Sequence, residues 1–209
     1  MSDTKFPRDF FRGVITQKNN GAYCVTNPAG SRSCVVSTRL LKGGQGDLAV
    51  GDEVTFDATD QITALLPRRN HLSRRAAAPR PGAYAYEQVI AANIDQIVPV
   101  FAAANPRPAW HLLDRYLVMA EAAEIPVLVC ITKMDLVAGH SEAKEIERVA
   151  AEYRAIGYPV LLTSTVNGDG LDLFRSALLD RRSLLVGKSG VGKTSLLNEL
   201  ETGLGLRVQ

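Results

Sequence analysis

The chain has 209 residues, of which 46% are hydrophobic and 22% charged, and its formal net charge is +2. This is enough apolar material for two modest domains, but no apolar stretch approaches the roughly 18 residues of a membrane span. The start lacks a basic segment followed by an apolar core, and the three cysteines (Cys24, Cys34 and Cys130) lack paired zinc-ligand spacing, so we expect a cytoplasmic protein with no membrane partner and no zinc site in this chain.

Short alternating segments occupy the first 67 residues, with turn-forming Asn, Gly and Pro between them. The predicted strands are 10–17, 22–27, 33–38, 53–57 and 61–66. Five strands at this spacing predict a Greek-key β barrel of the OB type over residues 1–67, an architecture that binds oligonucleotides. Residues 1–80 hold twelve Lys and Arg against seven Asp and Glu, which favours an acidic partner, although ordinary surface solvation explains such an excess equally well.

An arginine-rich segment punctuated by proline follows the barrel, and we interpret residues 68–82 as a basic linker. Four of its arginines are candidate contacts for RNA phosphates: Arg68, Arg69, Arg74 and Arg75. The alternative is a solvated linker whose arginines pair with acidic side chains of the protein itself.

From residue 83 onward, buried apolar strands alternate with amphipathic helices, which predicts an α/β domain with a mostly parallel sheet. The predicted strands are 94–101, 125–131, 158–163 and 183–187. The predicted helices are 108–124, 141–156, 171–180 and 194–200. Their apolar stripes should cover the sheet, and Trp110 fits a core position better than a base-stacking platform.

A polar tetrapeptide ends the strand at 125–131, at the sheet edge where α/β proteins bind ligands. It consists of Thr132, Lys133, Met134 and Asp135. A carboxylate there accepts two hydrogen bonds from guanine N1–H and N2–H₂, whereas adenine would leave it unpaired. The tetrapeptide therefore resembles the guanine motif of GTPases, and Ser164 with Thr165, after the next strand, resembles their base-contacting loop.

A phosphate-binding loop of the form G-x-x-x-x-G-K-[ST] lies between the strand at 183–187 and the last helix. Its glycines let successive N–H groups point at phosphates, Lys193 neutralises β/γ charge, and the Thr194 hydroxyl is the predicted Mg²⁺ ligand. The residues expected to bind nucleotide here are Gly187, Lys188, Ser189, Gly190, Val191, Gly192, Lys193, Thr194 and Ser195.

The order of these motifs is circularly permuted, because ordinary small GTPases carry the Walker loop first and the guanine motif later. With its N-terminal barrel, the chain resembles the circularly permuted GTPases of the RsgA (YjeQ) family, which depend on the small ribosomal subunit, from about residue 10 to residue 200. Further segments that carry the resemblance are 51–54, 66–74, 92–96 and 113–117.

The resemblance implies a GTPase that binds GTP or GDP with Mg²⁺ and hydrolyses GTP during late maturation of the small (30S) ribosomal subunit. It also implies contacts of the barrel with 16S rRNA and a monomeric protein. The alternative is an RNA-binding fragment that binds guanine nucleotide without turning it over. An ATP-using P-loop kinase is a third reading, but it leaves Thr132 to Asp135 unexplained.

Several features of the family are not found in these 209 residues. No glycine has an aspartate three positions earlier, so the second switch motif, Asp-x-x-Gly, is missing. The family's zinc module has no ligands here either. We therefore expect an incomplete GTPase domain over residues 83–209 and name no catalytic residue. Two local departures are Thr132, where the family usually has Asn, and Lys188, where it often has Gln, which adds a positive charge near the phosphates.

Overall fold

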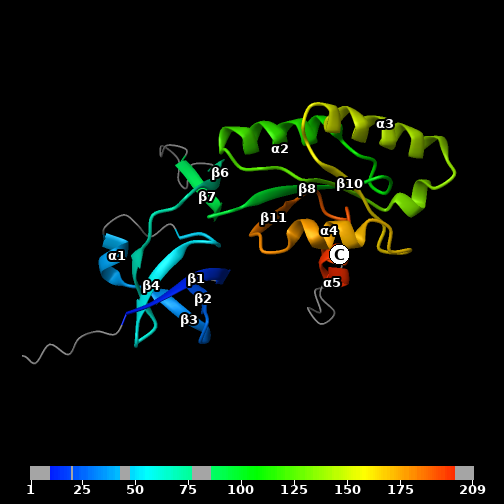
Figure 1. The fold of residues 1–209 in the computed structure, drawn as a ribbon. Helices are drawn as coiled ribbons and strands as arrows, with labels where there is room; N and C mark the ends of the chain where they lie inside the picture. The colour runs from blue at the N-terminus through cyan, green and yellow to red at the C-terminus, as the bar shows by residue number, and fades with distance from the viewer. Residues whose placement is uncertain (1–9, 20, 43–47, 77–85, 201–209) are drawn as a thin grey trace, which may run out of the picture. The chain divides into compact units, whose positions relative to one another are not determined.

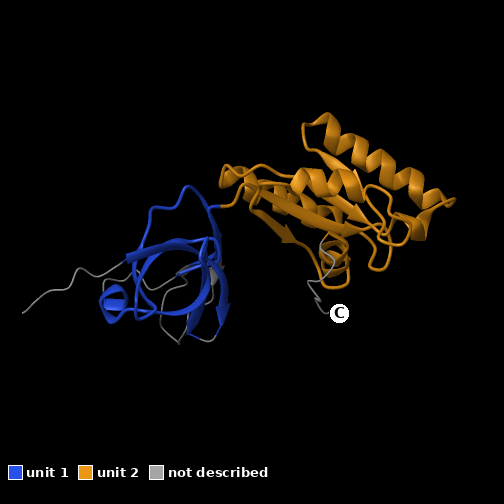
Figure 2. Cartoon of the chain, turned by 60° about the horizontal axis from the view of Figure 1, so that its bottom comes forward, with its two compact units in different colours: residues 1–93 blue, residues 94–209 orange. Residues whose placement is uncertain are grey.

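A computed structural model describes residues 10–19, 21–42, 48–76 and 86–200. The chain divides into two compact units, residues 1–93 and residues 94–209 (Figure 2). Each unit has its own sheet and its own hydrophobic core, so each is described separately.

The first unit contains a closed five-stranded barrel with the strand order β1-β2-β3-β5-β4 (Figure 1). Its elements are β1 (Phe10–Asn19), β2 (Ala22–Asn27), β3 (Gly30–Val36), the short helix α1 (Thr38–Lys42), β4 (Glu53–Asp57) and β5 (Gln61–Leu65). Inward-facing residues such as Ile15, Val25, Val54 and Phe56 are buried and fill the interior. The OB-type barrel predicted from the sequence is confirmed, whereas β3 begins and ends earlier than expected because the chain enters α1 at Thr38.

A β hairpin follows the barrel, made of β6 (His71–Ala76) and β7 (Tyr86–Ala92). The sequence had suggested a linker over residues 68–82, so β6 corrects that interpretation in its middle part. The sequence of β6 lacks the alternation of apolar and polar residues that predicts a strand. Among its described side chains, Leu72 alone is buried. The partner strand β7 supplies the hydrogen bonds that make these residues extended.

The second unit is built on a parallel sheet with the order β10-β9-β8-β11. Its strands are β8 (Gln96–Ala102), β9 (Val129–Thr132), β10 (Val160–Leu162) and β11 (Ser183–Val186). Its helices are α2 (Trp110–Ala122), the 3₁₀ turn η1 (Met134–Val137), α3 (Ser141–Ala155), α4 (Leu171–Leu178) and α5 (Lys193–Leu200). All four predicted strands and all four predicted helices are present, with shifted ends.

Two helices cover each face of this sheet: α2 and α3 lie on one side, α4 and α5 on the other (Figure 1). Successive residues of β8 face opposite sides. Val100 packs toward Phe174 and Leu196 in the core beneath α4 and α5, while the Phe101 ring stacks on Trp110 of α2 with centroids 6.0 Å apart. This layering brings the carboxyl ends of the strands and the loops after them to one edge of the unit.

Candidate nucleotide-binding site

The Walker loop connects β11 to α5, and its backbone can be formed only with glycine at key positions. Gly187 has φ +155°, and a Cβ there would lie 2.4 Å from the carbonyl oxygen of Val100 in β8. Gly190 and Gly192 also have positive φ, +79° and +97°. The loop therefore lies directly against the sheet, in a conformation that L side chains rarely adopt.

Lys193 curls back into the concave side of its own loop. Its Nζ donates to the carbonyl oxygens of Gly187 at 2.9 Å and Lys188 at 2.8 Å. Burial lowers the pKa of the Lys193 amine from its ordinary value, because desolvation disfavours the charged form. A partly desolvated ammonium inside a loop of turned N–H groups is suited to an anion with several oxygens.

Thr132 ties the end of β9 to the Walker loop. Its buried Oγ1 lies 2.5 Å from the Val191 carbonyl oxygen and 3.2 Å from that of Phe101. A hydroxyl has one proton to donate, so the shorter contact, to Val191, is the stronger bond. Although threonine lacks the amide expected in this family, its hydroxyl still braces the phosphate loop.

Lys133 links the guanine motif to two other loops. Its backbone is left-handed, with φ +59°, and its Nζ donates to the Gly190 carbonyl oxygen at 2.7 Å and also to that of Asn105. Sequence reasoning missed Asn105, because a backbone carbonyl acceptor leaves no residue-type signal. These contacts fix the Lys133 ammonium between the loop after β8 and the Walker loop.

Asp135 meets Ser164, so the predicted guanine motif and the loop after β10 lie in contact. The Ser164 hydroxyl donates to Asp135 Oδ1, and the Met134 N–H donates to the Thr163 carbonyl oxygen at 3.2 Å. Ser164 is fully buried and Thr165 is half-buried. These contacts orient the carboxylate and place the loop after β10 beside η1.

The loop residues were tested for a fit to a nucleotide and to Mg²⁺. The half-buried Thr194 and Ser195 hydroxyls lie in the first turn of α5, and a helix start favours negative charge. A Cβ at Gly192 would lie 3.3 Å from Thr132 Oγ1. Glycine at this position therefore allows the loop to approach the end of β9 closely. Hydroxyl oxygen is a suitable Mg²⁺ ligand, and the donor set fits both groups.

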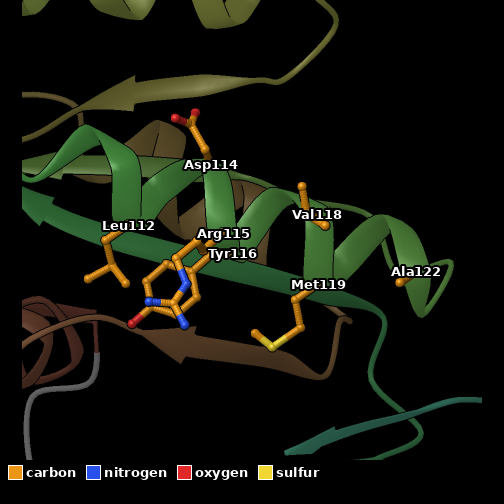
Figure 3. A pocket seen from close by; sticks show the side chains of 7 residues that line it. All are labelled: Leu112, Asp114, Arg115, Tyr116, Val118, Met119 and Ala122. Carbon is orange, nitrogen blue, oxygen red and sulfur yellow. The ribbon is translucent and has the colours of Figure 1, made fainter.

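Two hollows in the second unit lie away from these residues. An open pocket of about 780 Å³ is lined by Leu136 and Val137 of η1, but not by Asp135 or the Walker loop. A groove of about 550 Å³ runs along α2, where Figure 3 shows Leu112, Tyr116 and Met119 projecting from the same helix. Neither hollow is lined by the Walker loop or by Thr132, Lys133 and Asp135, so we place the site on the loops.

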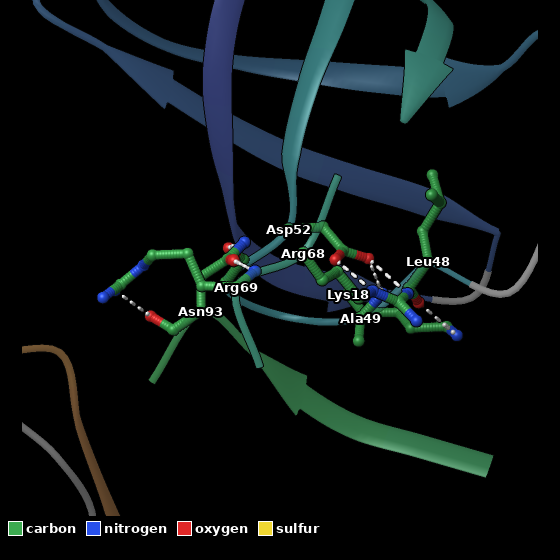
Figure 4. Close-up of polar contacts among 8 residues, drawn as sticks. Lys18, Leu48, Ala49, Asp52, Arg68, Arg69 and Asn93 are labelled. Carbon is green, nitrogen blue, oxygen red and sulfur yellow. Dashed lines mark hydrogen bonds and ion pairs between the residues drawn. The ribbon is translucent and has the colours of Figure 1, made fainter. Parts of the chain in front are cut away.

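The predicted RNA-binding arginines lie in the first unit, where Arg68 forms an internal ion pair. Its Nε and Nη2 donate to the two carboxylate oxygens of Asp52 at 2.7 and 2.8 Å (Figure 4). Asp52 is fully buried and also accepts the Ala49 N–H at 2.8 Å. The Arg68 guanidinium therefore pairs with an internal carboxylate, and its contact with RNA stays a prediction.

Asn93 extends this internal network from the barrel to the hairpin. Its side-chain amide donates to the Gly51 carbonyl oxygen at 2.9 Å and accepts the Arg69 N–H at 2.8 Å. The Ala92 N–H donates to the Val50 carbonyl oxygen at 2.9 Å. We call Asp52, Arg68, Arg69 and Asn93 the barrel staple, because these contacts fix the hairpin to the barrel.

The two remaining arginines of the set belong to β6. Arg74 is exposed and donates from Nε and Nη2 to Gln88 Oε1 at 3.1 and 3.0 Å. That partner is neutral, and Arg74 has no ion pair among the residues whose side chains are described. The side chain of Arg75 lies outside the described residues.

Metal sites and membrane segments were searched within the described ranges. Those ranges contain no group of three or more His, Cys, Asp or Glu side chains placed to hold a metal ion. No helix in them combines the length and apolar character needed to cross a bilayer.

Comparisons with known proteins agree with this geometry. The profile of the family described as RsgA GTPase matches residues 65–209. The chain is 41% identical over 204 residues to the small ribosomal subunit biogenesis GTPase RsgA of Gemmatimonas aurantiaca, covering 93% of this chain and 64% of the relative. It is 35% identical over 199 residues to the protein of the same name from Bacillus pumilus, covering 93% and 63%.

Two solved structures share the fold. The chain is similar to YjeQ from Thermotoga maritima with a TM-score of 0.75 at 27% identity, covering 96% of this chain and 68% of that one. It is similar to YloQ, described as a circularly permuted GTPase, with a TM-score of 0.65 at 32% identity, covering 91% and 64%. The chain thus spans somewhat less than two thirds of the length of the first curated relative.

Proposed function

The chain belongs to the RsgA GTPase family, and we propose that it binds guanine nucleotide with Mg²⁺ and acts in maturation of the small ribosomal subunit. The permuted order of its motifs and its barrel match the circularly permuted GTPases among its structural relatives. The relatives' name supplies the ribosomal role, which this chain shares under the proposal.

One observation carries the nucleotide part of the proposal: the guanine motif is bonded to the Walker loop. Thr132 and Lys133 donate to the carbonyl oxygens of Val191 and Gly190, and the motif's Asp135 is held by Ser164. Two hydrogen bonds thus tie the guanine motif to the Walker loop, and a third ties it to the loop after β10. A chance glycine turn would not need such a connection.

In the proposed complex, each group has a defined task. Asp135 accepts from guanine N1–H and N2–H₂, and the backbone near Thr165 donates to the base. Lys193 exchanges its carbonyl partners for phosphate oxygens, and the loop N–H groups from Lys188 to Thr194 surround them. Mg²⁺, when bound, neutralises phosphate charge and takes Thr194 as a ligand. We assign no residue to the positioning of the attacking water.

We further propose that the barrel, predicted over residues 1–67, contacts 16S rRNA while residues 83–209 carry the nucleotide. The excess of Lys and Arg in residues 1–80 supports this division, since phosphate contacts dominate RNA affinity. The barrel architecture supports it as well. With Arg68 used inside the protein, Arg74 is the member of the predicted set best placed for RNA.

Base choice is tested by competition with labelled GDP. We expect GTP and GDP to displace it and ATP to fail, and Asp135→Asn to invert the preference toward xanthine nucleotides, whose C2 oxygen accepts from the new amide. The matched control is Asp172→Asn, a fully exposed carboxylate on α4. Equal displacement by ATP and GTP in the unmutated chain would refute guanine specificity.

The second candidate function is a binder without turnover, favoured by the missing Asp-x-x-Gly motif in the 209 residues. We expect single-turnover GTP hydrolysis by this chain to stay near the uncatalysed rate and not to respond to small ribosomal subunits, because switch residues sense the γ-phosphate and Mg²⁺ in GTPases. Hydrolysis stimulated by subunits would show that these 209 residues already contain the catalytic groups.

A further inference from the structure

Two cations that are 81 positions apart in the sequence meet beside the Walker loop. Arg107 follows β8 and Lys188 is the second residue of the loop, and both line one small hollow together with Pro106, Ala109 and Val191. Both residues are exposed. Within the described part of the chain, neither side chain makes a hydrogen bond or an ion pair. Two like charges on the lining of one hollow repel each other, so the pair favours an anion.

Lys188 and the Walker lysine, Lys193, have different surroundings. Lys193 Nζ occupies the concave side, on the carbonyl oxygens of Gly187 and Lys188, and Lys193 does not line the hollow. The hollow itself measures about 10 Å³, room for a single water at most. An anion would therefore rest on its rim, between the two side chains.

The start of α2 adds to the same positive potential. This 13-residue helix begins at Trp110, and no side chain caps its first N–H groups at Ala109. Those groups carry partial positive charge toward the rim. Glu142 at the start of α3 acts electrostatically with Arg107, and both line a larger pocket together with Glu145. Among the described residues, neither carboxylate forms an ion pair with Arg107.

We propose that Arg107 and Lys188 bind a backbone phosphate of RNA, which gives the nucleotide-binding unit an RNA contact of its own. The inference rests on the proposed function, because the ribosomal partner supplies the RNA. Guanidinium and ammonium groups converging on one rim suit the tetrahedral oxygens of phosphate. The Lys188 carbonyl oxygen holds the Walker lysine, so RNA at this rim lies one residue from the group that binds nucleotide phosphate.

The test measures binding of a short fluorescein-labelled single-stranded RNA to the 209-residue chain over a salt series. Each lost phosphate contact lowers the slope of log affinity against log salt by about 0.7. We expect Arg107→Gln and Lys188→Gln each to lower it by about that amount, and the double variant by about twice as much. Arg148→Gln, which removes one exposed charge from α3, is the control and should leave the slope unchanged. A double variant with the control's slope would overturn the proposal.

Labelled GDP, measured on the same variants, separates this inference from the proposed function. Intact GDP binding with an unchanged RNA slope would refute the phosphate contact alone, whereas failure of the unmutated chain to bind GDP would refute the proposed function. If Lys188→Gln weakened GDP binding and left the RNA slope unchanged, Lys188 would serve its own nucleotide. Competition by poly-glutamate as strong as that by RNA would indicate an acidic protein instead, and would also overturn the assignment.

Discussion

Arg68 of the first unit and the pair Arg107 and Lys188 of the second unit differ in what they contact. In the first unit, Arg68 donates twice to the buried Asp52, and the staple around it fixes a hairpin to the barrel. In the second unit, Lys188 and Arg107 project from loops without an ion-pair partner among the described residues. The difference lies in whether a buried carboxylate is nearby. An arginine beside a buried carboxylate forms an ion pair with it and is not available to a ligand.

The units also differ in how their polar network is closed. Asn93 of the staple uses both ends of its amide on backbone groups of the same unit. In the Walker loop, Lys193 instead donates to two carbonyl oxygens. A phosphate can replace these acceptors without leaving the lysine unpaired. A closed network rigidifies a scaffold, whereas one built on exchangeable partners prepares a site for a ligand.

The largest effect should come from opening the closed network. Asp52→Ala leaves Arg68, whose side chain is 20% exposed, without its carboxylate, and we expect a loss of about 3 kcal/mol in the stability of the first unit. Urea unfolding followed by alkylation of Cys34, which is buried in the barrel, measures it. Arg12→Ala, which breaks the exposed pair with Glu53, should cost less than about 1 kcal/mol. Comparable losses would show that the Asp52–Arg68 pair contributes no more to stability than an exposed ion pair does.

The Walker loop should be sensitive at one glycine and tolerant at another. Gly187→Ala forces a Cβ against the Val100 carbonyl oxygen at 2.4 Å, while a Cβ at Gly190 meets nothing within 4 Å. We expect Gly187→Ala to abolish measurable GDP binding and Gly190→Ala to weaken it about tenfold or less, through its strained φ alone. Titration with labelled GDP decides between them, and equal losses would mean that contact with β8 is irrelevant.

The sequence predicted most of the fold because its strands and helices are strongly patterned. The barrel, the parallel strands and the helices on both faces followed from apolar periodicity and glycine turns. The hairpin strand β6 did not, since Arg74 and its neighbours carry no alternation and depend on pairing with β7. The staple was missed for a similar reason: Asp52 and Arg68 are 16 residues apart, and only the closed barrel brings them together.

In the candidate site, residue type predicted the side chains that make contacts, but it could not predict contacts made by backbone carbonyl groups. Thr132, Lys133 and Asp135 lie in contact with the predicted loops, but the carbonyl oxygen of Asn105 that Lys133 contacts gave no sequence signal. The nucleotide roles of these residues stay predictions until binding is measured.

A smaller effect is expected at the hydroxyl that joins the guanine motif to the Walker loop. Thr132→Val keeps the shape but removes the donor to the Val191 carbonyl oxygen, a loss of about 1 kcal/mol. We expect GDP affinity to fall about fivefold while the unfolding midpoint of the first unit is unchanged. The matched control is Thr163→Val, because this buried threonine donates to the Ile131 carbonyl oxygen rather than to the Walker loop. An equal loss of GDP affinity in the control would show that the bond from Thr132 to the loop does not matter for binding.

The smallest change concerns the rates at which two buried thiols react, one in each unit. Burial raises the pKa of Cys34 in the barrel to about 11 and that of Cys130 in the sheet to about 12. A raised pKa leaves less thiolate at any pH below it, so at pH 8 both should react with iodoacetamide far more slowly than the half-buried Cys24. Mass spectrometry of tryptic peptides gives the three rates.

The same measurement separates the two units. Asp52→Ala should accelerate alkylation of Cys34, because opening of the first unit exposes its thiol, while Cys130 keeps its slow rate. Bound GDP should protect Cys130 further without affecting Cys34, since ligand binding stabilises only the unit that holds it. If Asp52→Ala accelerated both thiols equally, the units would unfold together, and the staple would support the nucleotide site as well as the barrel.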